Sequence, residues 1–331
     1  MKQWTAEVMQ QSQRIAIPFI THPGIALTGK KVIDVVTDGQ AHYEAIRALD
    51  EKFPAAACTV IMDLTVEAEA FGAEVVFPEN EIPSVIGRLV TDLESIEKLA
   101  VPELLVARLP QYLLANELVA ANITDKPVFS VCIGPFSLAC RLYDMSEFMM
   151  ACYCEPETAK LLLNKCTQFI LKYCHALKQQ GLNGIIIADP AAGLLSGDGC
   201  DDFSSLYIKP IVEAVQDDDY MVMVHNCGNT GQCTRAMLRT GAMALHFGNK
   251  IDMVSVLKEC PSDVLVLGNV DPVGLFKTAD PHVMKKAVSD LLEKTKDYPN
   301  YILSSGCDVP PHTPFANIEA FYEALEEFNG Y

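Results

Sequence analysis

Two segments of the sequence place metal-binding side chains directly after short apolar runs. His225 and Cys227 stand two residues apart after "YMVMV", and Cys307 follows "YILSSG". Residues i and i+2 of an extended chain point to the same side, so His225 and Cys227 can bind one ion. One imidazole and two thiolates with a fourth position open are typical of catalytic zinc. We therefore predict a zinc site at these three residues, and the alternative is that they are core residues at strand ends.

The neighbouring residues support a metal site, and the other cysteines do not extend it. Gly228 and Gly306 flank the predicted ligands and would allow tight backbone turns. Twelve cysteines are present, and most are expected to be small buried hydrophobic residues. A structural role is predicted for the other cysteines that lie near turns or in helical stretches, namely Cys132, Cys140, Cys152, Cys154 and Cys233.

The elements that would position the ligands are short β-rich runs that alternate with longer helical stretches. Such alternation predicts a parallel sheet with helical crossovers. Eight strands are predicted, at residues 15–20, 58–62, 128–133, 184–189, 220–225, 243–247, 264–270 and 301–306. The clearest predicted helices span 156–181 and 280–298. The fold class is therefore α/β, and eight such units in roughly 300 residues are typical of a (β/α)8 TIM barrel.

The domain organisation follows from the same pattern. No linker or low-complexity segment interrupts the chain, so residues 1–331 are predicted to form a single barrel domain. Residues 63–127 are long for one crossover, which predicts an insertion there. A doubly wound open sheet is the alternative, but the first predicted strand lacks the glycine-rich turn of a dinucleotide site.

A TIM barrel has its active site at the carboxyl ends of the strands, and further polar residues lie at these ends. Asp63 and Asp189 are the candidate catalytic residues, with helix capping as the alternative for each. The candidate substrate-binding residues are His22, Asn229, His246 and Asn269. For His246 the alternative is a buried histidine with satisfied hydrogen bonds, and for Asn229 and Asn269 it is simply the termination of a strand.

The composition limits the classes of partner. Lys and Arg number 25 and Asp and Glu number 43, which gives a net charge of −18. Such a surface repels nucleic acid and anionic membranes, and it suits small molecules or complementary proteins. No run approaches the roughly 18 apolar residues of a transmembrane helix, and the first twenty residues lack a signal-peptide core. The expected location is cytoplasmic, where cysteines stay reduced, and the composition allows a homo-oligomer.

Three motifs give the chain a resemblance to a known family. The segments "HNCGN" (225–229), "LGNVDP" (267–272) and "SGCDVPPHTPFANIEAF" (305–321) resemble the uroporphyrinogen decarboxylase superfamily. They look specifically like its cobamide-dependent methyltransferase branch, the methylcobamide:coenzyme M methyltransferases. Further segments that match in style and order are "DLTVEAEAFGAEV" (63–75), "VCIGPFSLA" (131–139) and "IIIADPAAG" (185–193).

The resemblance implies a (β/α)8 barrel in which His225, Cys227 and Cys307 hold zinc. It also implies that the zinc binds the thiol of a small acceptor, such as coenzyme M, as a thiolate. The thiolate would attack the methyl group of a methylcobalamin-type corrinoid carried by a separate corrinoid-binding protein. A zinc-bound thiol is deprotonated near neutral pH, which agrees with this chemistry.

Other activities remain open at this point. Members of the same branch work in the opposite sense and demethylate methoxy or methylamine-type donors, and homocysteine or a folate could replace coenzyme M. A decarboxylase would need arginines near the first strand, and residues 15–27 contain none. Asp63 aligns with the acidic residue of the decarboxylases, which keeps that alternative in view. A non-catalytic binding barrel is the third alternative.

Overall fold

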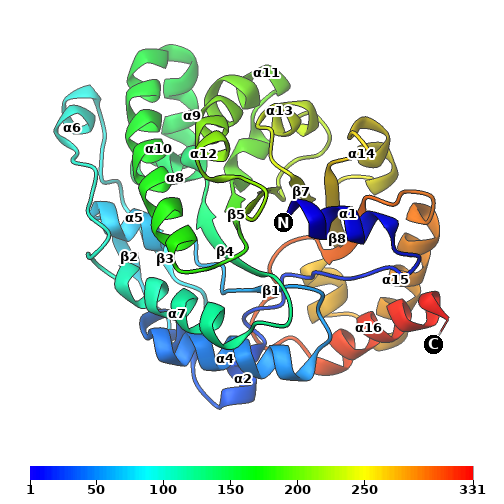
Figure 1. The fold of residues 1–331 in the computed structure, drawn as a ribbon. Coiled ribbons are helices and arrows are strands. Elements are labelled where there is room, and N and C mark those ends of the chain that lie inside the picture. The colour runs from blue at the N-terminus through cyan, green and yellow to red at the C-terminus, as the bar shows by residue number, and fades with distance from the viewer. Residues whose placement is uncertain (331) are drawn as a thin grey trace.

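Seven parallel strands form one curled sheet at the centre of the computed structural model, which describes residues 1–330 (Figure 1). The strand order β1-β4-β5-β6-β7-β8-β9 follows the chain without reversal, unlike a doubly wound sheet. The protein is therefore an α/β barrel of the TIM type. The strands are β1 (Cys58–Thr59), β4 (Val128–Ile133), β5 (Gly184–Ala188), β6 (Met221–Asn226), β7 (Ala244–Phe247), β8 (Leu265–Val270) and β9 (Tyr301–Ser305).

The first predicted strand, at residues 15–20, is an extended segment with one β-bridge, between Ala16 and Leu303. Its other side contacts the segment just before β1, because the Ala56 N–H donates to the Ala16 carbonyl at 2.9 Å. The segment thus occupies the eighth position and closes the barrel between β9 and β1. Pro18 has no N–H to donate, so the ladder cannot continue past it. The prediction of eight regular strands is corrected to seven strands and this seam.

Helices lie outside the sheet and cover its outer face (Figure 1). The predicted helices at 156–181 and 280–298 are confirmed as α10 and α15, each slightly shorter than predicted. The helices are α1 (Lys2–Gln10), α2 (Gly24–Thr28), α3 (Val32–Thr37), α4 (Gly39–Lys52), α5 (Val66–Phe71), α6 (Leu93–Lys98), α7 (Leu109–Asn122), α8 (Pro135–Tyr143), α9 (Met145–Cys154), α10 (Pro156–Gln179), α11 (Gly197–Cys200), α12 (Leu206–Val215), α13 (Thr234–Arg239), α14 (Met253–Glu259), α15 (Pro281–Thr295) and α16 (Phe315–Asn329). Short helical segments of other types are η1 (Pro190–Leu194), η2 (Asp201–Ser205) and η3 (Pro272–Lys277).

Residues 63–127, where the sequence predicts an insertion, hold more than one crossover helix. Besides α5, α6 and α7 they contain an antiparallel pair, β2 (Glu74–Val76) and β3 (Ser84–Ile86), which is separate from the barrel sheet. Figure 1 shows α6 at the edge of the molecule, where it packs against α10, while α7 packs against α4.

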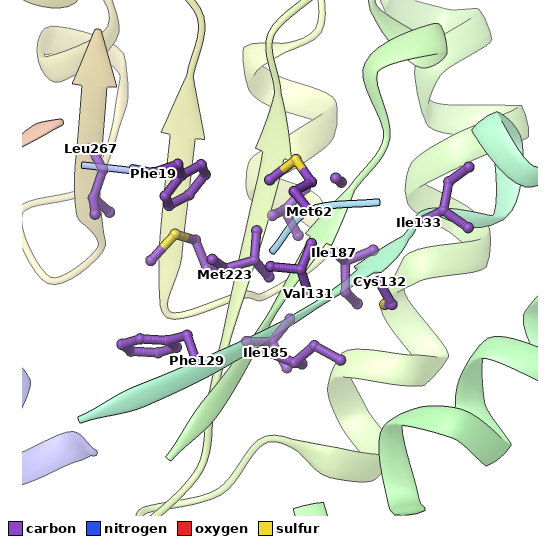
Figure 2. Close-up of a cluster of buried hydrophobic side chains, with 14 of the residues drawn as sticks. Phe19, Met62, Phe129, Val131, Cys132, Ile133, Ile185, Ile187, Met223 and Leu267 are labelled. Atoms are coloured by element: carbon purple, nitrogen blue, oxygen red, sulfur yellow. The ribbon is translucent and has the colours of Figure 1, made fainter. Parts of the chain in front are cut away.

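The core is a single hydrophobic cluster that extends from the barrel interior to the surrounding helices. Every residue of β4, β5, β6 and β7 is buried, as expected for parallel strands covered on both faces. Figure 2 shows part of this core, including Val131, Ile187 and Met223 from three neighbouring strands. No helix within residues 1–330 has the length and apolar character needed to cross a membrane.

Candidate metal centre

The barrel brings together the three predicted ligands from two strand ends. His225 lies on β6 and Cys227 follows that strand directly, while Cys307 follows β9. One ligand atom from each residue lies within 4.8 Å of the other two. His225 is buried, whereas Cys227 and Cys307 are partly exposed, so the group is open on the sulfur side.

The atoms of this group suit a zinc ion. The Nε2 atom of His225 is buried, and within residues 1–330 it has no hydrogen-bond partner. Such an atom is costly unless it binds something, and a ring nitrogen with a free lone pair is a common zinc ligand. One nitrogen, two sulfurs and an open side match the donor set of catalytic zinc, so the residues present fit the metal.

The two sulfurs have opposite pKa shifts. The adjacent Cys307 thiol and the nearby His225 lower the pKa of Cys227 to about 4, although burial opposes this. The neighbouring Cys227 sulfur and burial raise the pKa of Cys307. A cation placed between the sulfurs would stabilise both as thiolates.

A buried network lies behind His225. Its Nδ1 is 2.7 Å from Nδ1 of His246 on β7, and Nε2 of His246 is 2.9 Å from the Ser304 hydroxyl on β9. The Ser304 hydroxyl donates to the Ile17 carbonyl in the closing seam at 2.7 Å. Phe19 stacks on the His246 ring with centroids 4.0 Å apart. Burial and the neighbouring His225 lower the pKa of His246, so this histidine is neutral and packed rather than turned toward a substrate.

Glycines let neighbouring turns approach the ligands closely. A Cβ atom on Gly248 would lie 2.9 Å from Cβ of Cys227, and one on Gly306 would lie 2.7 Å from the Asn249 backbone nitrogen. Gly228 packs against Gly193 of η1, where an added Cβ on Gly193 would lie 2.2 Å from the Gly228 carbonyl carbon. Gly228 and Gly306, predicted to allow tight turns, therefore act through close packing and not through left-handed backbone angles.

Asp63, a candidate catalytic residue, is held by a network of its own. Its carboxylate accepts hydrogen bonds from Arg108 at 2.6 Å, from the Tyr112 hydroxyl at 3.0 Å and from Thr65. Arg108 also donates to Glu69 at 2.6 Å, so its charge is fully engaged. None of these partners is a predicted zinc ligand. The geometry favours a structural role for Asp63 over catalysis or support of the metal.

Asp189, the other candidate catalytic residue, caps a helix. Its Oδ1 accepts from the Ser137 backbone N–H at the start of α8, and its Oδ2 accepts from the Ser204 hydroxyl, both at 2.6 Å. Burial raises the pKa of Asp189, and these hydrogen bonds lower it in part. Its contact with β6 is through the backbone, because the Asp189 N–H donates to the His225 carbonyl at 2.9 Å.

Asn229 and Asn269, two candidate substrate-binding residues, use their amides for local structure. Asn229 accepts from the Gly231 and Cys233 backbones and donates to the Thr234 hydroxyl, so it stabilises the turn that leads into α13. The Asn269 amide nitrogen donates to the carbonyls of Gly248 and Ile251 at 2.8 and 2.7 Å. These contacts favour loop support, and substrate binding by Asn229 and Asn269 stays a prediction.

His22, the remaining candidate, lies beside the loop of the third ligand. Its Nδ1 is 2.7 Å from Oδ2 of Asp308, the residue after Cys307. Burial lowers the pKa of His22, but the Asp308 charge outweighs this and raises it. The Nε2 atom is buried, and the described part of the chain offers it no hydrogen-bond partner. Of the candidate substrate-binding residues, His22 therefore has a polar atom left for a bound molecule.

The cysteines predicted to be structural behave mostly as expected. Cys132, Cys140, Cys152 and Cys233 are buried, whereas Cys154 is exposed at the end of α9. All twelve cysteines are free thiols.

A cavity of about 370 Å³ opens at the carboxyl ends of β4 and β5, between the β2–β3 pair and η1. Leu64, Ile133 and Ser137 line it, as does Pro190, whose carbonyl packs against Gly228 of the metal-site loop. This places a volume suited to a small molecule on the same face of the barrel as the ligands.

Some residues of the site were not foreseen from the sequence. Asp308 could have been found, because it directly follows Cys307 and a carboxylate often orients a histidine. Ser304 and Phe19 become visible only when β9 and the closing seam are paired. Arg108 reaches Asp63 from the segment between two helices and has no local signal.

Comparison with known proteins identifies the family of this barrel. The family model described as uroporphyrinogen decarboxylase (URO-D) matches residues 14–328, so the chain belongs to the URO-D family. This confirms the resemblance inferred from the motifs.

Particular relatives fall into two kinds. The methylcobamide:CoM methyltransferase MtbA of Methanosarcina acetivorans is 29% identical over 276 residues, which cover 82% of this chain and 80% of that protein. The uroporphyrinogen decarboxylase of Legionella pneumophila strain Corby is 26% identical over 282 residues, covering 82% and 79%.

Solved structures support the fold. A methyltransferase from Methanosarcina mazei superposes with a TM-score of 0.88 at 23% identity and covers 98% of this chain and 97% of that chain. A B12-independent methionine synthase from Shewanella sp. W3-18-1 superposes with a TM-score of 0.62 at 12% identity, covering 96% and 97%. At these identities the likeness concerns the fold alone.

Proposed function

We propose that this chain is a zinc-dependent methyltransferase that moves a methyl group between a corrinoid on a partner protein and a small thiol such as coenzyme M. The observation that supports this most strongly is the group formed by His225, Cys227 and Cys307, with ligand atoms within 4.8 Å of one another and an open side. Similarity to the MtbA protein of Methanosarcina acetivorans supports the methylcobamide and thiol chemistry.

The residues of the chain would each have a defined task. His225, Cys227 and Cys307 hold the metal, and the partly exposed sulfur side leaves room for the acceptor. When bound, zinc supplies the positive charge that keeps the acceptor sulfur deprotonated at neutral pH. The acceptor sulfur then bonds to the methyl carbon while the methyl–cobalt bond breaks and leaves its electron pair on cobalt. His22, with an unpartnered Nε2, is the proposed contact for a polar group of the acceptor.

The partners and the location follow from the same proposal. The methyl donor is methylcobalamin bound to a corrinoid protein, which must approach the carboxyl face of the barrel where the ligands lie. Transfer in the opposite sense, from a methoxy or methylamine-type donor onto the corrinoid, would use the same residues. Twelve free thiols suit a reducing compartment, so the proposed location is the cytoplasm.

Decarboxylation of a uroporphyrinogen-like acid is the competing activity, since URO-D relatives carry that name. It requires cationic groups that are free to hold substrate carboxylates. Arg108, the buried arginine beside Asp63, is already paired with Asp63 and Glu69. This pairing favours the methyltransferase.

The first experiment measures metal content and methyl transfer in the same preparations. We expect about one zinc per chain by elemental analysis, and a thiol-dependent loss of methylcobalamin absorbance with coenzyme M or homocysteine. Cys307→Ala should lose both the zinc and the transfer. Cys154→Ala, which removes an exposed thiol on α9, is the matched control and should keep both.

Each outcome bears on the proposal. Zinc-loaded protein that shows no thiol-dependent demethylation, but decarboxylates a porphyrinogen, would replace the methyltransferase with the decarboxylase. Transfer that survives in Cys307→Ala at the wild-type rate would exclude the proposed metal site.

A further inference from the structure

The tautomer of His225 decides whether it can bind a metal at all. A neutral imidazole carries one proton, and only its unprotonated nitrogen has a lone pair for a cation. The Nε2 atom is the one without a hydrogen-bond partner among the described residues, and Nδ1 lies 2.7 Å from Nδ1 of His246. A metal at Nε2 therefore requires His225 to carry its proton on Nδ1 and to donate it to His246.

Ser304 determines which nitrogen of His246 carries a proton. A serine hydroxyl has a single proton, and that of Ser304 is donated to the Ile17 carbonyl at 2.7 Å. Toward Nε2 of His246, 2.9 Å away, the Ser304 oxygen can then act only as an acceptor. His246 must therefore have its proton on Nε2.

The metal position decides which histidine donates. The His246 side chain is fully buried and its ring is stacked on Phe19 at 4.0 Å. Side-chain hydrogen bonds join its ring to Nδ1 of His225 and to the Ser304 hydroxyl. A metal at Nε2 of His225 leaves the proton of that ring on Nδ1, so His225 is the donor and Nδ1 of His246 is the acceptor. This agrees with a His246 proton on Nε2, where Ser304 accepts it.

We propose that Ser304 and His246 are positioning residues that fix the metal-binding tautomer of His225. The chain of hydrogen bonds runs from Nδ1–H of His225 to His246, from Nε2–H of His246 to Ser304, and from Ser304 to the Ile17 carbonyl. It crosses from β6 through β7 and β9 to the closing seam, and it leaves Nε2 of His225 unprotonated. This inference rests on the proposed zinc site. It adds a second layer of residues, His246 and Ser304, that positions the ligand His225.

The chemistry of this second layer has a consequence for the metal. Ligand histidines commonly donate to a carboxylate, which adds negative charge behind the ring. Here a neutral imidazole and a hydroxyl replace it, so the two thiolates remain the anionic ligands. A less negative ligand set leaves a zinc ion more able to hold an acceptor thiolate.

The test uses the full chain with Ser304→Ala, Ser304→Thr and a matched control. Ser304→Ala removes the acceptor for Nε2–H of His246. His246 can then carry its proton on Nδ1, where that N–H would face the Nδ1–H of His225 and could not accept a hydrogen bond from it. Ser304→Thr keeps the hydroxyl. Ser130→Ala is the control, because Ser130 is also a buried strand serine but its hydroxyl has no partner within residues 1–330.

Two measurements are made on each protein. Zinc affinity is measured by competition with a chelator, and Ser304→Ala should bind zinc at least about tenfold more weakly, as is usual when support of a ligand is lost. Ser304→Thr should recover most of the affinity, and Ser130→Ala should match the wild type. Nitrogen NMR of the seven histidines in metal-free wild-type protein should show Nδ1–H on His225 and Nε2–H on His246.

The outcomes separate this inference from the proposed function. A wild-type spectrum with the proton on Nε2 of His225, or wild-type zinc affinity in Ser304→Ala, would overturn the inference. If Ser304→Ala does not fold, the wild-type spectrum still decides the tautomers. If the wild-type protein binds no zinc, the proposed function fails, while the same spectrum still tests the hydrogen-bond chain in the metal-free protein.

Discussion

At the scale of single residues, Asp63 shows how a carboxylate near a strand end can be committed to the fold. It is buried and ion-paired to Arg108 at 2.6 Å. We predict that Arg108→Ala leaves this charge without its cation and lowers the free energy of unfolding by about 3–5 kcal/mol. Urea denaturation measures the loss. Arg47→Ala, which removes an exposed pair with Glu51, is the control and should cost less than about 1 kcal/mol. Similar losses in the two variants would contradict the structural role.

Glu67 is a buried carboxyl group that makes stability depend on pH. Its Oε1 accepts from the Ile133 N–H, its Oε2 has no partner in the described residues, and burial raises the pKa of Glu67 to about 7. The folded protein thus holds a proton that the unfolded chain releases near pH 4.5. The stability linked to this proton is complete at low pH and is lost as the pH rises through 7.

Glu67→Gln removes this ionisation, and we predict a stabilising effect that grows with pH. Relative to wild type, the gain in the free energy of unfolding should be roughly 2–3 kcal/mol larger at pH 8 than at pH 5. Urea denaturation at both pH values checks this. A gain of the same size at the two pH values would show that Glu67 titrates normally in the fold.

At the scale of elements, the proposed metal centre depends on how closely the turn after β7 approaches the turn after β6. A Cβ atom on Gly248 would lie 2.5 Å from the Cys227 carbonyl oxygen and 2.9 Å from its Cβ. We predict that Gly248→Ala displaces Cys227 and weakens zinc binding at least about tenfold, as measured by chelator competition. Gly199→Ala is the control, because its nearest neighbour is a side-chain atom and not backbone, the Ser196 hydroxyl at 3.2 Å. Unchanged affinity in Gly248→Ala would mean that the turn can yield.

The element scale also shows what could be predicted from the sequence. Apolar runs and i, i+2 spacing are local signals, so the barrel strands and the grouping of His225, Cys227 and Cys307 as candidate ligands were predictable. The seam at residues 15–20 was predicted as a strand, because its apolar run outweighed the effect of Pro18. The partners of Asn229 and His246 depend on which turns and strands meet, and no local pattern contains that information.

At the scale of the whole molecule, the sites that were hard to predict are those that join distant segments. Ser304 contacts Ile17 across the closing seam, and Arg108 reaches Asp63 from the segment between α6 and α7. The contact of Ser304 depends on closure of the barrel, which the sequence indicates only through the number of its strands. The proposed metal centre depends on closure too, since it joins the end of β6 to the end of β9.

Zinc should therefore stabilise the entire barrel and not only its own loops. A metal that binds the folded state but not the unfolded state adds about 4 kcal/mol when its concentration is 1,000 times the dissociation constant. We predict that removal of zinc lowers the midpoint of thermal unfolding by roughly 5–15 °C, measured by calorimetry. Cys154→Ala should show the same decrease, whereas Cys307→Ala should melt at one temperature with or without zinc. Equal midpoints for zinc-loaded and zinc-free wild-type protein would mean that the metal site forms independently of barrel closure.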